Sequence, residues 1–182
     1  MTEDKHLLKL LHSGDVDALR AIYEKYKDDL LTVAVSLLSD VHTAQDCLQD
    51  VFVGFAANSK KLNVRRNLKG YLLSCIVNRA RDQLRENKAS PMQQLADSDC
   101  TGSQAGPVEQ LIDSERRAMV FGAMAKLPCE QREIIALHLQ GGMTFRQIAR
   151  LQGESINTAQ SRYRYGIEKL RGFLKKEHEN ET

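Results

Sequence analysis

The sequence predicts an all-α protein of two small helical domains joined by a flexible linker, the C-terminal domain being a helix-turn-helix. Three observations predict this architecture. Apolar residues recur every three to four positions through most of the 182 residues, which is the helical period. Aromatic residues make up only 5% of the chain, Trp is absent and Pro occurs three times, a composition that favours helices over a sandwich or barrel. A stretch rich in Ser, Gly, Asp and Gln over residues 89–108 interrupts the periodicity.

Basic residues are informative here by their placement, because the net charge is only +2. They gather in residues 60–88 and 162–176, which indicates two patches that face nucleic acid. No apolar run approaches the ~20 residues that a membrane-spanning helix needs. The N-terminal segment is charged and amphipathic and lacks the apolar core of a signal peptide. We therefore expect no direct membrane insertion and a cytoplasmic location.

No residue pattern indicates a catalytic centre, a metal site or a cofactor site. The four cysteines (Cys47, Cys75, Cys100 and Cys129) form no CxxC pair and are interpreted as reduced thiols, with a switch at Cys100 as the alternative. The five histidines are scattered without metal-ligand spacing. P-loop, HExxH and GxSxG motifs are absent from the sequence. We expect no metal, no cofactor and no enzymatic activity.

The N-terminal domain, residues 1–88, is predicted to contain four helices. The first covers residues 4–12, and Asp15 is placed to cap a second that reaches residue 38. Ser39 and Asp40 are expected to break it before a third helix at 43–58. A basic loop over 60–67 follows, and Asn67 is placed to cap a fourth helix that reaches residue 87.

Two polar faces stand out on these helices. Asp46, Gln49 and Asp50 lie at i, i+3 and i+4 on the third helix, opposite its apolar residues, and so share one exposed side. On the fourth helix, Asn78 and several arginines lie away from the apolar stripe. A solvated helix face is the default interpretation of the acidic stripe taken alone, and some of the arginines are expected to pair with Asp82 or Glu86.

The linker, residues 89–108, is long enough to separate the domains. About 20 residues span roughly 70 Å when stretched and about 25 Å on average as a coil. This length permits two domains to reach separate sites on one DNA duplex.

The C-terminal domain, residues 109–182, is predicted to hold a helix at 109–126, a second from Pro128 to the Gly141-Gly142 pair, and a helix-turn-helix. Thr144 and Gln147 form a capping box for a short helix at 145–151. A turn at 152–155 follows, and Ser155 is placed to cap the last helix, residues 156–176.

The last helix has two faces of different chemistry. An apolar stripe is predicted to face the core, and it comprises Ala159, Tyr163, Ile167, Leu170 and Leu174. The residues off this stripe are short hydrogen-bonding or cationic side chains near the helix N-terminus: Asn157, Thr158, Gln160, Ser161, Arg162, Arg164 and Tyr165. Arg and Gln pair with base edges, while Ser, Thr and the helix N-terminus hold phosphates, so these residues suit a recognition helix. The alternative is an ordinary solvated helix.

Three segments in this order resemble a bacterial sigma-70-family RNA polymerase factor of the small, extracytoplasmic-function (ECF) type. AQDCLQDVF (44–52) is similar to the family's polymerase-binding helix, and GYLLSCIVNRARDQLR (70–85) is similar to its −10-reading helix. LPCEQREII, GGMTFRQIA and NTAQSRYRYGIEKLR, within residues 127–171, are similar to its −35-reading domain. The resemblance covers nearly the whole chain.

The resemblance implies that residues 1–88 are sigma region 2 and residues 109–182 are sigma region 4. It implies that Asp46, Gln49 and Asp50 dock on the polymerase β′ clamp helices, because an acidic hydrogen-bonding stripe suits a basic partner. The implied partners are the polymerase core (β′ and β subunits), promoter DNA and an anti-sigma factor. The implied −10 contacts are Arg65, Arg66, Lys69, Tyr71, Asn78, Arg79, Arg81 and Arg85. The implied −35 contacts are Thr144, Asn157, Thr158, Gln160, Ser161, Arg162, Arg164 and Tyr165.

The sequence departs from the family pattern at several positions. Tyr71 stands where the family usually has Trp, and Ser74 and Val77 stand where it often has Arg. Gln152 and Glu154 occupy turn positions that are usually apolar, and Ile156 is the residue expected to fill that gap.

Two other functions remain open on the sequence. A conventional helix-turn-helix regulator would bind palindromic half-sites without polymerase, and the segment 44–52 argues against it. A helical adaptor that has lost DNA binding would tolerate Ala at Arg162 and Arg164, whereas a sigma factor would lose promoter use.

Overall fold

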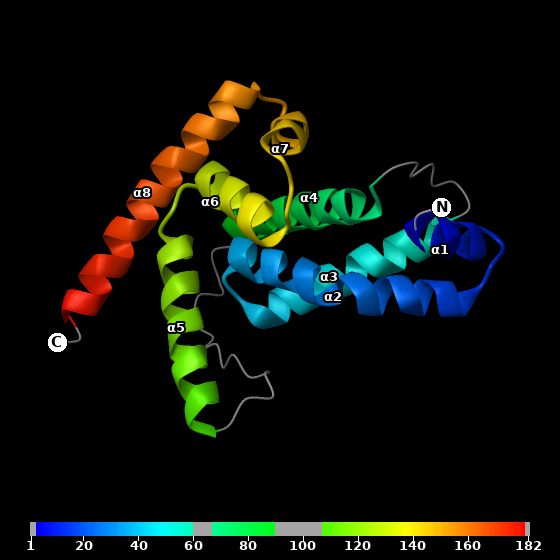
Figure 1. Cartoon of the computed structure of the whole chain (residues 1–182), viewed down its shortest axis with the longest axis horizontal. Coiled ribbons are helices and arrows are strands. Elements are labelled where there is room, and N and C mark those ends of the chain that lie inside the picture. Colours follow the sequence, from blue (N-terminus) through cyan, green and yellow to red (C-terminus); the bar gives the residue numbers. More distant parts are fainter. Residues whose placement is uncertain (1–2, 60–66, 90–106, 181–182) are drawn as a thin grey trace.

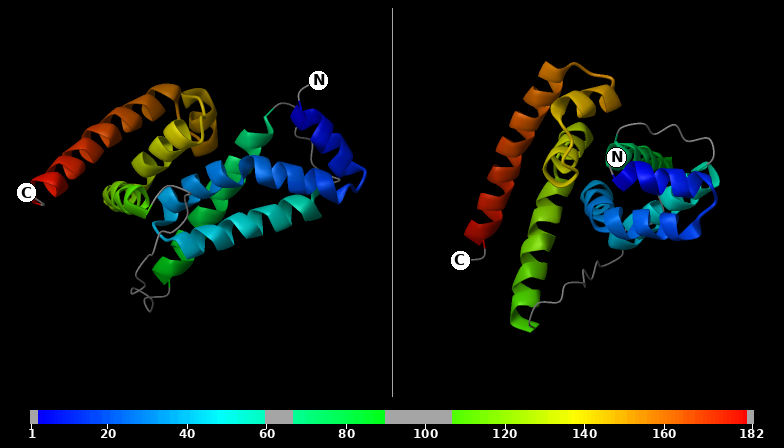
Figure 2. Two further views of the ribbon diagram at one scale, coloured as in Figure 1. Left: turned by 60° about the horizontal axis from the view of Figure 1, so that its bottom comes forward. Right: turned by 45° about the vertical axis from the view of Figure 1, so that its right-hand side comes forward.

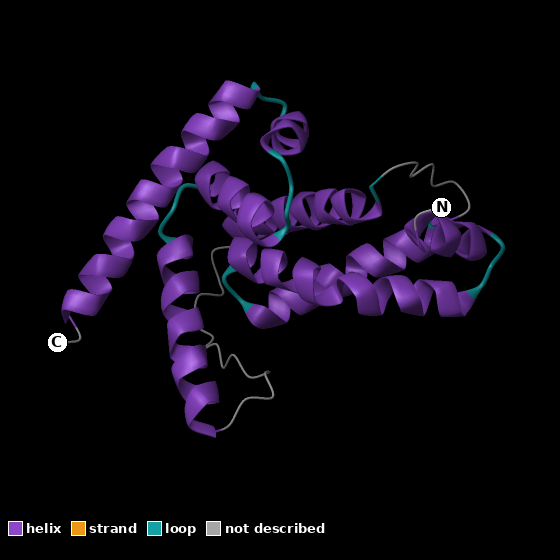
Figure 3. Ribbon diagram, in the orientation of Figure 1, coloured by secondary structure: helices purple, strands orange, loops and turns teal. Residues whose placement is uncertain are grey.

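The computed structural model describes residues 3–59, 67–89 and 107–180, and this part of the chain is helical with short turns and no strand (Figure 3). The predicted all-α class is therefore confirmed. Region 60–66, with Arg65 and Arg66, lies outside the described residues, as does most of the predicted linker. The helices are α1 Glu3–His12, α2 Val16–Leu38, α3 Val41–Ala57, α4 Leu68–Ala89, α5 Pro107–Ala125, α6 Cys129–Ile135, the π-helix η2 Ala136–Gln140, α7 Phe145–Gln152 and α8 Ile156–Asn180.

Predicted helix caps form at several of these termini. The Asp15 carboxylate accepts the N–H of Asp17 at 2.9 Å at the start of α2. Thr144 and Gln147 form the full capping box at the start of α7. Ser155 Oγ accepts the N–H of Thr158 at 3.0 Å at the start of α8. Each bond satisfies a backbone donor that has no partner within the helix, which fixes where the helix begins.

One helix boundary differs from the prediction. Asp40 caps α3 rather than merely ending α2, because its Oδ2 accepts the N–H of Thr43 at 2.7 Å, and α3 begins at Val41. Ser39 adopts a left-handed conformation (φ 60°) between the helices, so two residues suffice to reverse the chain. Ser is an uncommon residue at positive φ, which is why the sequence did not indicate so short a connection.

The N-terminal half is built around α2. Figures 1 and 2 show α2 and α3 lying side by side with α4 crossing them, and α1 folded back along α2. Ile22 and Leu30 of α2 are fully buried together with Leu72 and Ile76 of α4. This shared core fixes which sides of α3 and α4 face outward.

The C-terminal half packs α5, α6 and α7 against the long α8, which lies at the outer edge (Figure 1). At Gly166, α8 lies close against α6, since a Cβ at this position would lie 2.9 Å from Ile135 Cδ1 and 3.2 Å from Gln131 Cβ. Ala159 and Leu170, both predicted core residues, are buried. Tyr163, Ile167 and Leu174 are partly buried against the same core, so the predicted apolar stripe is confirmed.

A π-helical turn, η2, replaces the end of the helix that the sequence predicts to run to Gly141. The N–H of Gly141 bonds to the carbonyl of Ala136, a five-residue step, at 3.0 Å. His138, within this turn, stacks on Phe145 with ring centroids 4.2 Å apart and meets Tyr163 edge-on at 5.1 Å. The three rings join η2, α7 and α8, and so hold the helix-turn-helix to the rest of its domain.

The two halves are in direct contact. α2 contacts α5, α6 and η2. Ser36 Oγ donates to Gln140 Oε1 at 2.6 Å, and Arg132 Nη1 donates to the carbonyl of Leu37 at 3.1 Å. The predicted linker length would let the domains separate, whereas the structure shows them packed together.

Candidate functional site

The predicted polymerase-binding stripe lies on the outer side of α3. Asp46, Gln49 and Asp50 are all exposed, while Cys47 and Leu48 between them are buried. Asp50 is paired with Arg79 of α4, whose Nη2 lies 2.8 Å from Oδ2. Hydrogen bonding to Asp50 raises the pKa of the Arg79 guanidinium. The stripe is therefore accessible, but one of its two carboxylates already has a cationic neighbour.

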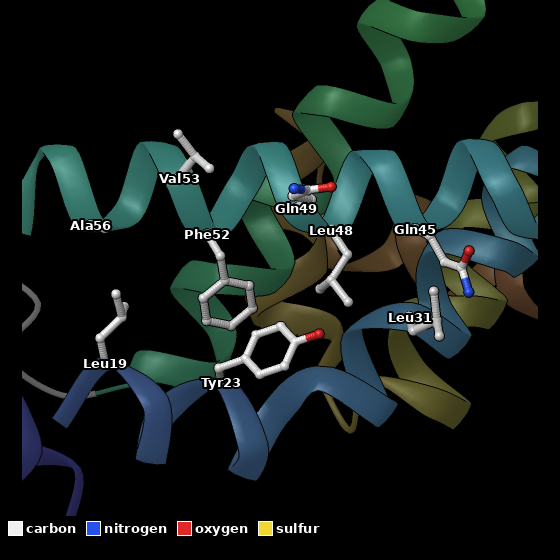
Figure 4. A pocket seen from close by; sticks show the side chains of 9 residues that line it. All are labelled: Leu19, Tyr23, Leu31, Gln45, Leu48, Gln49, Phe52, Val53 and Ala56. Carbon is white, nitrogen blue, oxygen red and sulfur yellow. The ribbon is translucent and has the colours of Figure 1, made fainter. Parts of the chain in front are cut away.

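An apolar groove of about 570 Å³ runs beside this stripe between α2 and α3 (Figure 4). Tyr23 and Phe52 form its floor, with ring centroids 4.9 Å apart at 76°. Val53 stands at its edge with 64% of its surface exposed. Gln45 and Gln49 also line it. Phe52 itself is buried, and the apolar residue that follows it, Val53, was the signal in the sequence of a docking surface.

The residues predicted on α4 differ in their surroundings. Asn78 is exposed, whereas Lys69 Nζ lies 2.6 Å from Asp29 of α2. Arg85 Nη1 is 3.5 Å from Asp82, and Arg79 Nη1 is 3.9 Å from Glu86, so the expected pairing of some arginines with these acids is confirmed.

Arg81 has the least expected partner of these residues. The prediction placed it among the exposed backbone-neutralising cations, but Nε and Nη2 donate to the two oxygens of Glu133 on α6, at 2.9 and 2.7 Å. This partner lies 52 residues away in the other half, so local spacing could not reveal it. In the structure Arg81 is bound to protein rather than free.

Tyr71 is half-buried and packs against the core of the N-terminal half. Its ring centroid lies 6.3 Å from that of Phe55 on α3. Burial raises the pKa of its hydroxyl to about 12. Tyr71 also lines a surface hollow, so it supports α4 and stays partly accessible.

That hollow separates α4 from the first helix of the helix-turn-helix. It measures about 530 Å³ and is lined by Tyr71, Ser74 and Asn78 on one side and by residues of α7 on the other. The predicted −10 face of α4 is therefore turned toward α7 in this arrangement. Val77, which stands where the family often has Arg, is fully buried and offers no side chain to DNA.

The predicted −35 residues at the start of α8 are largely accessible. Asn157, Gln160 and Arg164 are exposed, and Tyr165 is 52% exposed with the Arg164 guanidinium 5.2 Å from its ring centroid. Thr158 and Ser161 are half-buried. Thr144 serves as the α7 cap, with its hydroxyl 2.8 Å from Gln147 Oε1.

The turn of the helix-turn-helix is closed in a way the sequence did not suggest. Ile156 is 40% exposed, so the expectation that it fills the turn is wrong. Gln152 turns inward instead, and its Nε2 donates to buried Glu133 at 3.0 Å. Glu154 stays at the surface and accepts from Arg162 Nη2 at 2.9 Å. The turn therefore stays polar, with the Gln152 amide nitrogen and the Glu154 carboxylate each bonded to a side chain, while the Gln152 Oε1 atom is buried without a hydrogen-bond partner.

Two cations on α7, absent from the prediction, line the hollow that faces α4. Arg146 and Arg150 are exposed, one turn apart, on the side away from buried Ile148 and Ala149. The helix before a recognition helix crosses the DNA backbone in helix-turn-helix proteins, so cations suit this position. Their i, i+4 spacing opposite an apolar pair was the signal that could have found them.

Comparisons with known proteins identify the family of the chain. The family model for Sigma-70 region 2 matches residues 22–90, and the model for Sigma-70 region 4 matches residues 117–170. The chain belongs to the sigma-70 family. It is an RNA polymerase sigma factor of the ECF type, and the conventional regulator is set aside.

Relatives resemble this sigma factor over almost its whole length. It is similar to the ECF RNA polymerase sigma factor SigW of Bacillus subtilis, at 23% identity over 94% of this chain and 96% of that protein. It is also similar to the ECF RNA polymerase sigma factor SigK of Mycolicibacterium vanbaalenii, at 29% identity over 92% and 87%.

Two solved structures share the fold of the sigma factor. CnrH in complex with the cytosolic domain of CnrY matches with a TM-score of 0.70 at 21% identity, over 94% of this chain and 97% of that one. The sigma factor RpoE with the anti-sigma factor NepR from Bartonella quintana matches with a TM-score of 0.67 at 23% identity, over 86% and 98%. Region 2 therefore corresponds to α2–α4, and region 4 to the later part of α5 through most of α8.

Sigma factors are transcription initiation factors.

Within the part of the chain that the structure covers, no helix combines the length and the apolar character that crossing a bilayer demands.

Proposed function

We propose that this sigma factor docks on core polymerase through α3, binds the −35 element with α8 and opens the −10 element with α4, without chemistry of its own. The observation that carries the proposal is the exposure of both predicted surfaces in the two regions that match the family. The acidic stripe adjoins an apolar groove, and the start of α8 presents unburied hydrogen-bonding side chains.

The polymerase-docking surface combines two kinds of contact. The groove with Phe52 and Tyr23 at its floor provides apolar area, and protein interfaces concentrate their binding energy in such buried aromatic centres. Asp46, Gln49 and Asp50 at its border supply acceptors for a basic partner. We assign this combined surface to the polymerase β′ clamp helices.

The promoter-binding surfaces lie on separate helices. On α8, Asn157, Gln160 and Arg164 are placed to reach base edges, and Arg146 and Arg150 of α7 are placed to hold adjacent phosphates. On α4, Asn78 is the exposed side chain that can read an unstacked base. The described cations Lys69, Arg79, Arg81 and Arg85 must exchange carboxylate partners for phosphates when DNA binds.

We further assign the chain a domain division at residues 1–88 and 109–182, a cytoplasmic location alongside polymerase, and an anti-sigma factor as regulator. The last assignment rests on the solved relatives, two of which are complexes with CnrY and with the anti-sigma factor NepR.

The test is run-off transcription from genomic fragments with purified core polymerase and this chain. We expect discrete start sites that require both proteins. Val53→Glu, at the exposed edge of the groove, should reduce co-purification with core polymerase about tenfold or more. Val16→Glu is the matched control, because Val16 is 76% exposed on α2 and lies outside the groove.

If Val53→Glu and Val16→Glu co-purified equally with core polymerase, the docking assignment would be overturned. Specific DNA binding by the chain alone, with no effect of polymerase, would overturn the proposal that promoter binding accompanies polymerase docking.

A further inference from the structure

We infer that Glu133 is a latch that holds the two halves of the free molecule closed by occupying the Arg81 guanidinium. The two-point contact runs from α4 of the N-terminal half to α6 of the C-terminal half, at 2.9 and 2.7 Å. The inference rests on the proposed function only where it concerns DNA.

The Glu133 carboxylate is well enclosed. Its side chain is 3% exposed, and it accepts a third hydrogen bond from Gln152 Nε2 at 3.0 Å. A buried carboxylate without partners is strongly unfavourable, so Glu133 needs its donors for as long as it stays buried. Opening the two halves would remove the two Arg81 bonds and expose the acid to water.

A phosphate and a carboxylate use the same fork of guanidinium N–H groups, so Arg81 cannot bind both in this way. Glu133 therefore stands where the backbone phosphate of an opened DNA strand would bind. The same closure sets α7 opposite Tyr71 and Asn78, leaving a hollow of about 530 Å³. A strand needs this face of α4 free, which requires α7 to move away.

The remaining contacts across the seam suit a reversible closure. Leu73 of α4 packs on Gly141, where an added Cβ would lie 3.1 Å from Leu73 Cδ1. Ser36 bonds to Gln140 and Arg132 to the carbonyl of Leu37. Interfaces between domains that move are similarly mixed in polarity. Among the seam contacts described, the Arg81–Glu133 pair is the one that engages a predicted DNA-binding residue.

The experiment compares the full-length chain with Glu133→Gln, which keeps the side-chain size but places amide hydrogens against the Arg81 donors. Glu130→Gln is the matched control, because Glu130 is an exposed acid on the same helix. Small-angle scattering reports the radius of gyration, and fluorescence anisotropy reports binding of a mixed-sequence single-stranded DNA. We expect Glu133→Gln to expand the molecule and to bind the strand about tenfold more tightly, since apparent affinity scales with the open fraction. Glu130→Gln should leave the radius unchanged.

An unchanged radius for Glu133→Gln would overturn the latch. Expansion without tighter strand binding would uphold the latch and overturn the assignment of α4 to the −10 strand. Should Glu133→Gln lose helical content, Arg81→Met provides the second variant, because it leaves Glu133 bonded to Gln152 within its own domain. Arg81→Met should expand the molecule without tightening strand binding, and a compact Arg81→Met would contradict the proposal.

Discussion

Arg79 of α4 donates a hydrogen bond from Nε to one carboxylate oxygen of Asp50 on α3 at 2.9 Å, and its Nη2 forms an ion pair with the same oxygen at 2.8 Å. The pair joins a residue predicted to bind polymerase to a residue predicted to bind the −10 strand. A change at either residue therefore alters the electrostatic surroundings of both surfaces.

We expect Arg79→Ala to impair promoter opening while leaving the fold intact. The two side chains are 34% and 52% exposed, and pairs of this kind contribute at most about 1 kcal/mol to stability. The loss of a strand contact should show as weaker permanganate reactivity of the opened −10 region, and urea unfolding should shift by less than about 1 kcal/mol. Capture of core polymerase should persist, because Asp50 is left free of its internal partner. If Arg79→Ala lost polymerase capture to the same extent as promoter opening, this separation of roles would be contradicted.

Glu154→Gln should strengthen binding to −35 DNA. Glu154 holds Arg162 at 2.9 Å, so removing the negative charge releases the guanidinium and lowers repulsion of phosphates. If Arg162 gains one phosphate contact, the slope of log affinity against log salt should steepen by about one unit. Glu168→Gln, an exposed acid further along α8, changes the charge equally without this pairing. Identical salt slopes for the two variants would remove Arg162 from the set of DNA contacts.

Gly166→Val should destabilise the C-terminal half by about 1–3 kcal/mol, the usual cost of overfilling a packed contact. The added Cβ would meet Ile135 and Gln131 of α6. Gly172→Val is the matched control on the same helix, because no atom lies within 4 Å of a Cβ there. Urea unfolding followed by circular dichroism measures the difference. Similar unfolding midpoints for both variants would show that α8 shifts away from α6 without loss of stability.

Helix boundaries and exposed faces were predictable from the sequence because they depend on neighbours within a few residues. The Asp15, Thr144 and Ser155 caps and the buried stripe through Ala159 all follow from local spacing, and all are present. The cap at Asp40 was missed because it depends on the unusual left-handed Ser39. The π-helix was missed because no residue pattern within 136–140 marks it.

The candidate site was predictable as a set of exposed residues but not as a set of contacts. Periodicity places Asp46, Gln49 and Asp50 outside, and the structure agrees. It cannot tell that Arg81 meets Glu133, because that contact depends on how two domains pack. The roles of the described site residues in polymerase and promoter binding remain predictions that the proposed variants test.

Asp40 should make stability depend on acid pH. Hydrogen bonds from the Thr43 hydroxyl and N–H hold the pKa of Asp40 below its ordinary value of 3.8. The stabilisation is therefore complete above about pH 4 and is lost as the pH falls through the lowered pKa. Asp40→Asn keeps a capping oxygen without this titration, so its unfolding free energy should approach that of the original chain as the pH falls from 6 to 2. Asp40→Ala should cost about 1 kcal/mol at pH 7. If the difference in unfolding free energy between the original chain and Asp40→Asn stayed constant from pH 6 to pH 2, stability would not depend on the ionisation of Asp40.

The wide turn at Ala136–Gln140 has a consequence for chain length. A π-turn accommodates one residue more than the α-helical turn it replaces, and each residue of an α-helix rotates the chain by about 100°. Deleting a single residue from this turn would restore α-helical geometry. It would also rotate α7 and α8, which follow, relative to the preceding helix. Gln140 would swing off Ser36, and His138 would leave the face of Phe145. One additional residue thus sets the angle at which the helix-turn-helix lies against the N-terminal half of the chain.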